Sequence, residues 1–289
     1  MDVQNNASLA KYSTLNIGGK AELFCEIKTL EELDIIVKYA EKKNIKITPI
    51  GKGSNILISD KGIKGLVIKM SNSYIYGEGS FLTVGSGTRL WQIAKYAQEK
   101  SLSGAEFLIG IPGTLGGGII SNAGAHGRDL SNIVKSVIIY DYNNGIHELT
   151  NEEIEFAYRK SIFRDRRDCI IAECKIELRP ESYREIANKM LEFTEQRKIK
   201  QPIKEPNAGS VFKNPKGFSA GKLIEEVGAK GWTQRGAKVS EHHANFIVNT
   251  GNATAKDVCE LINRIKKRVK EKKGVELELE IVLLGEEFY

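Results

Sequence analysis

Apolar and polar positions alternate near the start of the chain and then change to helical spacing. The alternation covers residues 20–28, and its apolar face consists of Ala21, Leu23, Cys25 and Ile27. Thr29 and Glu32 follow as a capping box, and the apolar residues behind them keep helical spacing until Asn44. The sequence therefore predicts a strand, a helix and a second strand at residues 46–50.

The same signals place the other elements along the chain. Short β-rich segments are expected at residues 65–70, 81–87, 134–142, 170–178 and 245–249. Helices are expected after Thr88, after Ser182, at residues 222–227 before Gly228, and in a basic segment at residues 258–273. A last strand is expected after Gly274, with alternate apolar positions from Val275 to Leu283.

The residue composition and the expected elements of the chain change near residue 180. Before that point β-rich and glycine-rich segments predominate, and after it a helix capped by Ser182 and Glu185 leads to a loop with three prolines. We expect an α+β protein with a larger domain at residues 1–180, whose two lobes span about 1–75 and 76–180. A smaller α+β domain is expected at residues 181–289, with the capped helix as the connector.

Composition narrows the class of protein. The chain has 289 residues, of which 41% are hydrophobic and 28% charged, as in an ordinary globular protein that folds without disulfides. Four scattered cysteines form no CxxC pair, so neither a zinc site nor a redox dithiol is expected, and no metal is predicted. The sequence shows neither a signal peptide nor an apolar run long enough to span a membrane. We expect a cytoplasmic monomer with buried, reduced thiols.

The formal charge of +6 is compatible with nucleic acid or with anionic small molecules as ligands. Much of the positive charge lies in the basic helix at residues 258–273, around an apolar stripe. No aromatic residues are interleaved there and no nucleic-acid-binding motif accompanies it, so we interpret these charges as a solvated face. No nucleic-acid partner is predicted.

Two glycine-rich segments are candidates for binding a diphosphate. The first is Gly51-Lys52-Gly53-Ser54-Asn55, and the second runs from Gly110 to Gly118 through Pro112, Gly113, Thr114, Gly116 and Gly117. Glycine lets backbone N–H groups approach an anion closely, but glycines also make ordinary tight turns, and either segment alone fits both readings. Neither matches a dinucleotide fingerprint or a P-loop, because Ile56 replaces the third glycine and no GK[ST] ending occurs. His126, in a third segment rich in small residues, is expected to be a hydrogen-bonding loop residue.

Read in order, seven motifs resemble the UDP-N-acetylenolpyruvoylglucosamine reductase (MurB) family over almost the whole chain. Four belong to that family's flavin-binding half: TLNIGG at residues 14–19, GKGSN at 51–55, IPGTLGG at 111–117 and NAGA at 122–125. Three are similar to its catalytic segments: YRKSIFR at residues 158–164, NAGSVFKNP at 207–215 and LELEI at 277–281.

The resemblance implies a fold and a cofactor. It implies a two-lobed FAD-binding domain of the vanillyl-alcohol oxidase (PCMH) type, followed by a smaller α+β substrate-binding domain, with FAD bound non-covalently. The implied cofactor-binding residues are Gly51, Lys52, Gly53, Ser54, Asn55, Pro112, Gly113, Thr114, Gly116, Gly117, Asn122, Ala123 and Gly124. Only a short stretch separates Arg164 from residue 180, so the chain is similar to the shorter second type of the family, which lacks the loop with a substrate-contacting tyrosine.

The resemblance also implies a reaction. In the family NADPH reduces FAD, and hydride then passes to the enolpyruvyl ether of a UDP-sugar to give UDP-N-acetylmuramate, a peptidoglycan precursor. Hydride arriving at the terminal carbon drives negative charge onto the carboxylate, and the α-carbon must then be protonated. Arg159 is expected to hold the carboxylate through its donor fork. Ser210 matches the proton donor, and Glu280 is expected to bind the developing acid or orient its partners.

Further positive and polar residues match family positions that bind the UDP-sugar. They are Tyr158, Arg197, Lys200, Lys213, Asn214 and Lys230. Ser240, His243 and Asn245 lie in one segment, and the sequence assigns them no role. Two alternatives stay open: a flavin oxidase or dehydrogenase of the same fold, which would lack the three catalytic motifs, and a basic nucleic-acid-binding protein, which would bind no flavin.

Overall fold

The computed structural model describes residues 1–166, 168–286 and 288 of the chain. These residues form two compact units that interleave along the sequence. Unit 1 consists of Met1–Val3, Cys25–Lys52 and Val67–Arg197, and unit 2 consists of Gln4–Phe24, Gly53–Leu66 and the chain from Lys198 onwards. The glycine-rich segment 51–55 is therefore divided between the units, and a domain boundary at residue 180 remains a proposal.

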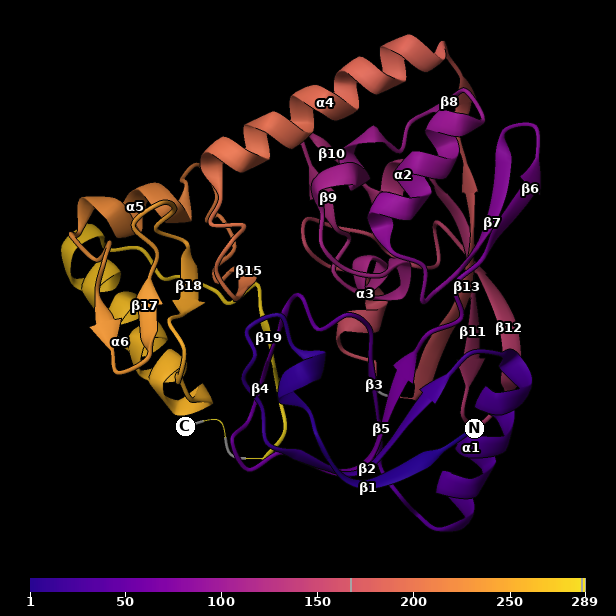
Figure 1. Ribbon diagram of the computed structural model, residues 1–289, viewed down its shortest axis with the longest axis horizontal. Coiled ribbons are helices and arrows are strands. Elements are labelled where there is room, and N and C mark those ends of the chain that lie inside the picture. Colours follow the sequence, from indigo (N-terminus) through magenta and orange to yellow (C-terminus); the bar gives the residue numbers. More distant parts are fainter. Residues whose placement is uncertain (167, 287, 289) are drawn as a thin grey trace. The chain divides into compact units, whose positions relative to one another are not determined.

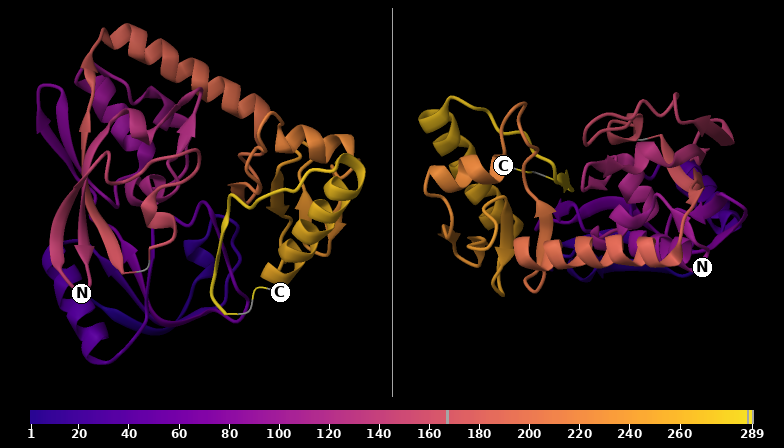
Figure 2. Two further views of the ribbon diagram at one scale, coloured as in Figure 1. Left: turned by 180° about the vertical axis from the view of Figure 1, so that it is seen from behind. Right: turned by 90° about the horizontal axis from the view of Figure 1, so that it is seen from above.

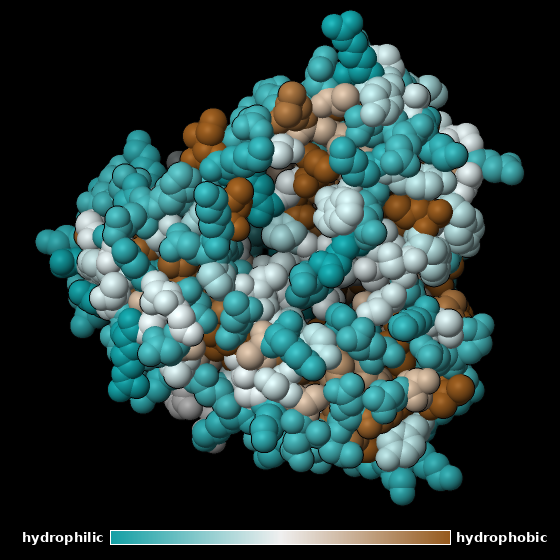
Figure 3. Space-filling model, in the orientation of Figure 1, coloured by the Kyte–Doolittle hydropathy of each residue, from teal (hydrophilic) through white to brown (hydrophobic). Residues whose placement is uncertain are grey.

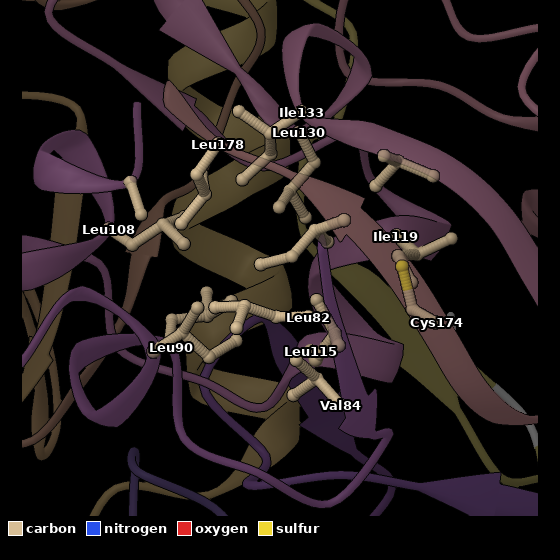
Figure 4. Packing of buried hydrophobic residues seen from close by; sticks show 14 of the residues in the cluster. Leu82, Val84, Leu90, Leu108, Leu115, Ile119, Leu130, Ile133, Cys174 and Leu178 are labelled. Atoms are coloured by element: carbon tan, nitrogen blue, oxygen red, sulfur yellow. The ribbon is translucent and has the colours of Figure 1, made fainter. Parts of the chain in front are cut away.

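Unit 1 contains a five-stranded antiparallel sheet with the order β12-β11-β13-β7-β6 (Figure 1). Its strands are β6 (Ile75–Glu78), β7 (Phe81–Gly85), β11 (Val134–Asp141), β12 (Gly145–Thr150) and β13 (Cys169–Glu177). Helices α2 (Leu90–Glu99) and α3 (Leu115–Ile120) share one apolar core with this sheet. Figure 4 shows Leu90 and Leu115 from the helices packed close to Leu82 and Val84 of β7. Removing this apolar surface from water stabilises the unit and fixes where both helices begin.

A four-stranded sheet has the order β1-β2-β5-β3. Its strands are β1 (Val3–Ser8), β2 (Lys20–Ile27), β3 (Ile47–Ile50) and β5 (Ile63–Met70), and helix α1 (Leu30–Lys42) joins β2 to β3. The Glu32 amide donates to the Thr29 hydroxyl over 3.2 Å, as the capping box predicts. Asn44 adopts φ 53°, a left-handed conformation in which the helix cannot continue. The predicted strand, helix and strand are thus confirmed.

Helix α4 (Tyr183–Lys200) leads from unit 1 into unit 2 at residue 198. Its first turn is capped by Ser182, whose hydroxyl accepts from the Glu185 amide over 3.2 Å, as predicted. Within unit 1, Phe193 of α4 stacks on His126 with ring centroids 3.9 Å apart. His126 thereby packs the loop at residues 122–127 against the helix. Two small strand pairs complete this unit: β8 (Leu102–Ser103) with β14 (Arg179–Pro180), and β9 (Gly124–Ala125) with β10 (Arg128–Asp129).

Unit 2 has a second core beneath the sheet β15-β18-β17-β16. Its strands are β15 (Asn207–Ser210), β16 (Thr233–Gln234), β17 (Ala237–Val239) and β18 (Phe246–Asn249), and its helices are α5 (Ala220–Glu226) and α6 (Ala255–Lys273). Helix α6 packs beside β16 and β17, and the left view of Figure 2 shows it in yellow next to the orange strands. The apolar stripe of α6 is buried from Val258 to Val269, while its lysines face solvent. Gly228 and Gly274 end the two helices with φ of 74° and 68°, as predicted.

The prediction of one long last strand after Gly274 is wrong in extent. Strand β19 covers only Val282–Leu284 and pairs in parallel with β4 (Ile56–Ile58). Residues 275–278 form no strand, and Leu279 makes a single bridge to Phe212. The segment that pairs with this part of the chain is short, because only residues 211–213 lie opposite residues 278–280, and three residues form a single bridge. The predicted alternation survives, because Leu277 and Ile281 are buried while Glu276 and Glu278 are exposed.

All four cysteines are free and buried, as predicted. Burial raises the pKa of Cys25, Cys169 and Cys259 to about 11, which keeps these thiols protonated and unreactive at neutral pH. Within the described ranges, no helix is both long and apolar enough to cross a membrane. Hydrophilic residues predominate on the face in Figure 3, and apolar ones occur there in small separate groups.

Candidate active site

The two glycine-rich segments meet within unit 1. Gly51 lies so close to Thr114 that a Cβ on Gly51 would stand 2.3 Å from the Thr114 hydroxyl oxygen. Arg89 and Thr114 form a backbone bridge, and the Leu90 amide donates to Gly113 over 3.2 Å. The structure therefore brings together Gly51, Gly113 and Thr114, which the sequence placed in separate loops.

The backbone amides after Thr114 are engaged by the protein itself. The Leu115 amide donates to the Thr88 carbonyl and the Gly116 amide to the Ser86 carbonyl, both over 2.9 Å. Gly116 also packs on Ser86, where an added Cβ would lie 3.1 Å from the Ser86 Cβ. Gly116 thus serves a close approach between backbone segments, and its N–H is not available to a phosphate.

Positive charge gathers beside Gly51. Burial lowers the pKa of the Lys52 ammonium below its ordinary value, and the nearby charges of Arg89 and Lys69 lower it further. Lys69 pairs with Glu26 over 2.9 Å. Within the described part of the chain, no carboxylate lies within salt-bridge distance of Lys52 or Arg89. An anion bound here would relieve the repulsion, and Arg89 is a contributor that sequence reasoning missed.

The second half of the GKGSN segment belongs to unit 2. Gly53 has φ +76°, and a Cβ there would stand 1.9 Å from the Tyr12 carbonyl oxygen, so only glycine fits. The Thr14 amide donates to the Gly53 carbonyl over 3.0 Å. The Thr14 hydroxyl lies 2.7 Å from the carbonyl oxygen of Asn207, at the start of the strand that carries Ser210. Thr14 therefore ties the loop to β15, a role that sequence reasoning missed although the TLNIGG motif contains this residue.

Backbone pairing in unit 2 joins the segments that carry Ser210 and Glu280. The Glu280 amide donates to the Val211 carbonyl and the Lys213 amide to the Glu278 carbonyl, both over 2.9 Å. Asn55 adds its side-chain amide, which donates to the Glu280 carbonyl over 3.3 Å. The residue after Ser210 thus lies opposite Glu280. Although about seventy residues separate them along the chain, these two predicted catalytic residues lie on neighbouring backbone segments.

Asn245 has a role that the sequence left open. Its side chain is 4% exposed and pairs with the backbone of Phe212 in both directions, over 3.0 Å as acceptor and 2.8 Å as donor. The Val211 amide also donates to the Asn245 carbonyl over 2.8 Å. Asn245 therefore fixes the segment that follows Ser210 against the start of β18.

Ser240 and His243 shape the turn that precedes Asn245. The Ser240 hydroxyl accepts from the amides of His242 and His243 over 3.1 and 3.4 Å. His243 in turn accepts from the Asn245 amide over 3.2 Å through Nδ1, and burial lowers the pKa of His243, which keeps the ring neutral. Both residues thus support the position of Asn245.

Arg159 lies in a tight turn of unit 1. Ala157 and Lys160 exchange two backbone hydrogen bonds of 2.9 and 3.1 Å, and Arg159 between them adopts φ 54°. Its guanidinium donates to the Gly124 carbonyl over 2.8 Å and lies 5.2 Å from the ring centre of Tyr158. The structure thus places Arg159 and Tyr158 beside the loop at residues 122–124, which was predicted to bind the cofactor.

The predicted substrate-binding residues differ in their surroundings. Lys213 faces Glu278 over 3.4 Å, Lys230 faces Glu225 over 3.0 Å, and Asn214 accepts from the Ala220 amide over 2.9 Å. Arg197, in unit 1, packs against Gly110, and burial lowers the pKa of its guanidinium. Among the described residues no carboxylate pairs with Arg197 or with the exposed Lys200. Of the predicted substrate-binding cations, these two therefore have charges that no described carboxylate compensates, so they are the ones best suited to bind an anionic ligand.

A polar cavity of about 360 Å³ lies in unit 2, lined by Glu205, Lys238, Ser240, Glu241 and His242. Lys238 and Glu241 pair across 2.6 Å, so its main charges compensate each other. The cavity contains none of the predicted catalytic residues. In the ranges that the structure describes, no group of three or more His, Cys, Asp or Glu residues could hold a metal ion.

Comparison with known proteins first defines the class. Residues 21–150 match the family model of an FAD-binding domain, and the mixed α+β fold is that of an FAD-binding oxidoreductase in which a further domain follows along the chain. Residues 201–284 match the model of the UDP-N-acetylenolpyruvoylglucosamine reductase C-terminal domain.

Relatives over nearly the whole chain define the family. The UDP-N-acetylenolpyruvoylglucosamine reductase of Caldanaerobacter subterraneus subsp. tengcongensis is 44% identical over 282 residues, covering 97% of this chain and 93% of that one. That of Bacillus subtilis is 40% identical over 283 residues, covering 97% of this chain and 93% of that one. The crystal structure of the MurB enzyme from Thermus caldophilus superposes with a TM-score of 0.82 at 35% identity and 98% coverage of both chains. The chain belongs to the UDP-N-acetylenolpyruvoylglucosamine reductase (MurB) family, and the predicted resemblance is confirmed.

Proposed function

We propose that this chain reduces UDP-N-acetyl-3-O-(1-carboxyvinyl)-glucosamine to UDP-N-acetylmuramate, with FAD as cofactor and NADPH as reductant, as a cytoplasmic monomer in peptidoglycan precursor synthesis. The observation that carries the proposal is the pairing of residues 211–213 with residues 278–280. This pairing holds Ser210 and Glu280, the matches to two catalytic positions of the family, on adjoining backbone segments. An oxidase of the same fold that acts on an alcohol or hydroxy acid would not need this arrangement.

The residues of unit 1 fit a dinucleotide diphosphate. Lys52 and Arg89 supply positive charge without carboxylate partners among the described residues, beside the close approach of Gly51 to Thr114. Such a site favours a ligand with two adjacent negative charges. We propose that Lys52 and Arg89, beside the close approach of Gly51 to Thr114, hold the diphosphate of FAD. Bound FAD supplies the hydride-transfer chemistry that no amino-acid side chain offers.

Arg159 is proposed to hold the carboxylate of the enolpyruvyl group. Its fork of N–H donors matches a carboxylate in two places at once, and this interaction strengthens as negative charge grows on the substrate. In the structure the fork already bonds to the carbonyl oxygens of Gly124 and Asn122, so its direction is set before substrate binds. Preorganisation of this kind favours the charged state of the reaction over its starting state.

Ser210 is proposed to protonate the α-carbon of the substrate. Among the described residues, nothing donates to or accepts from its half-buried hydroxyl, so the hydroxyl is free to turn toward a ligand. A hydroxyl is a weak acid, but the carbanion that forms beside a carboxylate is a strong base. Glu280, held at the backbone by Val211 and Asn55, is proposed to orient this acid or its partners.

The nucleic-acid alternative loses support from the basic helix α6. Three of its lysines face carboxylates: Lys267 with Glu271, Lys270 with Glu276, and Lys273 with Glu226. Arg264 lies over the ring of Trp232, 3.9 Å from its centre. Because three of these lysines face carboxylates of the chain itself, α6 has less uncompensated charge for a polyanion than its sequence suggests.

Separate half-reactions test the proposal. The purified protein, reconstituted with FAD, should give a flavin spectrum, lose its yellow colour with NADPH under anaerobic conditions, and regain it on addition of the enolpyruvyl UDP-sugar. Acid precipitation should release the flavin, because the binding is non-covalent. Reduced protein that is reoxidised by oxygen but not by the enolpyruvyl sugar would overturn the proposed substrate. Failure to bind FAD at all would overturn the cofactor.

A further inference from the structure

The side chain of Asn122 joins the turn of Arg159 to two other segments of unit 1. Its amide nitrogen donates to the Ala157 carbonyl over 3.1 Å, and its amide oxygen accepts from the Ser131 backbone over 3.1 Å. The carbonyl of Asn122 itself accepts from the guanidinium of Arg159 over 3.5 Å. One residue thus contacts both the base of the turn and the side chain at its tip.

Asn122 is only 2% exposed, so its amide is directed into the protein and little of it could reach a ligand. We propose that Asn122 is a positioning residue for Arg159, which gives its side chain a different task from the cofactor contact implied by the family resemblance. The inference rests on the proposed function of Arg159 and deepens it.

Backbone conformation explains why asparagine suits this position. Asn122 has φ 42° and Arg159 has φ 54°, and both lie in the left-handed region that side chains other than asparagine and aspartate rarely adopt. Asparagine tolerates this conformation, whereas Arg159 must be held in it by its neighbours. Two hydrogen bonds hold the chain on either side of Arg159. The Asn122 amide donates to the Ala157 carbonyl before it, and the buried Ser161 hydroxyl after it donates to the Ile120 carbonyl over 3.0 Å.

Removing the Asn122 side chain should change the orientation of the Arg159 guanidinium as well as the stability of the fold. Without the Asn122 amide, the Ala157 carbonyl loses its side-chain donor, and the base of the turn loses one of its ties to the segment at residues 120–124. Arg159 would then sample several directions, and a donor fork that is misplaced by about 1 Å loses on the order of 100-fold in rate. The loss should affect the step in which the substrate carboxylate gains charge more than it affects flavin reduction by NADPH.

Three variants separate these effects. Asn122→Gly keeps the left-handed backbone but removes both side-chain bonds. Asn122→Asp keeps the acceptor for Ser131 and replaces the donor to Ala157 by an oxygen. It therefore tests the hydrogen bond to Ala157 separately, and it replaces the glycine variant if that variant fails to fold. Asn151→Ala is the matched control: Asn151 donates to the Ser131 and Val134 carbonyls over 3.1 and 2.7 Å in the same unit, without touching the Arg159 turn.

Hydrogen exchange of the apoprotein gives a readout that needs no activity. The amides of Ala157 and Lys160, which bond to each other's carbonyls, should exchange faster in both Asn122 variants and normally in Asn151→Ala. In the FAD-loaded enzyme, reoxidation by the enolpyruvyl sugar should fall about 10 to 100-fold in Asn122→Gly. Reduction of bound FAD by NADPH, which involves no substrate carboxylate, should fall less than reoxidation.

A double variant decides whether Asn122 acts through Arg159. If it does, Asn122→Gly should add almost nothing to the defect of Arg159→Ala. Additive defects, or normal exchange and normal reoxidation in Asn122→Gly, would overturn the positioning role while the proposed function stands. If Arg159→Ala itself reoxidises at the wild-type rate, the proposed function of Arg159 fails, and the positioning role falls with it.

Discussion

Replacing Ser210 by alanine should separate chemistry from folding more cleanly than any other change in this chain. Among the described residues the Ser210 hydroxyl makes no hydrogen bond, while the backbone of Ser210 is held by its register with Phe246 in β18. Alanine keeps that backbone and removes only the free hydroxyl. The free energy of unfolding should therefore change by no more than about 0.5 kcal/mol.

The effect on the proposed proton transfer should be much larger. Loss of one well-placed acid slows its step by about 100 to 10,000-fold, which raises the activation free energy by roughly 2.7 to 5.5 kcal/mol. Reduction of FAD by NADPH does not involve this proton and should proceed at the wild-type rate. Stopped-flow absorbance at the flavin band, recorded separately for reduction and for reoxidation by the enolpyruvyl sugar, measures both steps.

Ser219→Ala is the matched control, because Ser219 is the N-cap of α5 and its hydroxyl accepts from the Lys222 amide over 3.4 Å. It should lose about 1 kcal/mol of stability and keep both half-reactions. The reasoning about Ser210 would be refuted by wild-type reoxidation in Ser210→Ala, which would assign the proton to water or to another group. Reduced thermal stability with normal turnover would assign Ser210 a structural role instead.

Three further changes follow from the same structure. Because the folded-state pKa of Lys52 is lowered, the unfolded chain binds more protons between that pKa and the ordinary 10.5, and apoprotein stability should rise with pH across this window. Lys52→Met should remove the rise, stabilise the apoprotein at neutral pH and weaken FAD binding, as denaturation curves and flavin titration would show. Thr14→Val leaves the Asn207 carbonyl without its donor at 2.7 Å and should cost about 1 to 3 kcal/mol in urea unfolding. Asp60→Ala removes the carboxylate that accepts from the Ala255 and Lys256 amides at the start of α6, and should lower the thermal midpoint by a few degrees without changing flavin affinity.

Local signals in the sequence predicted the longer helices and several of the strands, but not the short helix α3 or the strands β1 and β12. The Thr29 cap, the left-handed Asn44 and the glycines that end α5 and α6 all lie where the pattern placed them, because each depends on a few neighbouring residues. The last strand was overestimated for the opposite reason. Its length depends on how much partner backbone residues 211–213 supply, and no local pattern in residues 275–283 records that.

Hydrogen bonds between residues far apart in the sequence could not be predicted from the sequence pattern. Thr14 bonds to Asn207 across 193 positions, and residues 4–24 and 53–66 belong to unit 2 although segments of unit 1 flank them along the sequence. A single polar side chain that meets a distant carbonyl leaves no periodic trace. The family resemblance supplied the identity of Arg159, Ser210 and Glu280, but the residues that hold them in place, such as Asn245, become visible only as contacts.

The glycine-rich segments show what such a pattern does and does not establish. Glycines at residues 51, 53 and 116 each mark a close approach, and in the structure the approaching atoms belong to Thr114, Tyr12 and Ser86. A glycine pattern therefore predicts crowding of the backbone but cannot distinguish a ligand from the protein itself. Charge makes that distinction here. Because Lys52 is pushed toward its neutral form by burial and by two neighbouring cations, this part of unit 1 favours an anion, and the assignment of the FAD diphosphate rests on Lys52 and Arg89 more than on the glycines that drew attention to it.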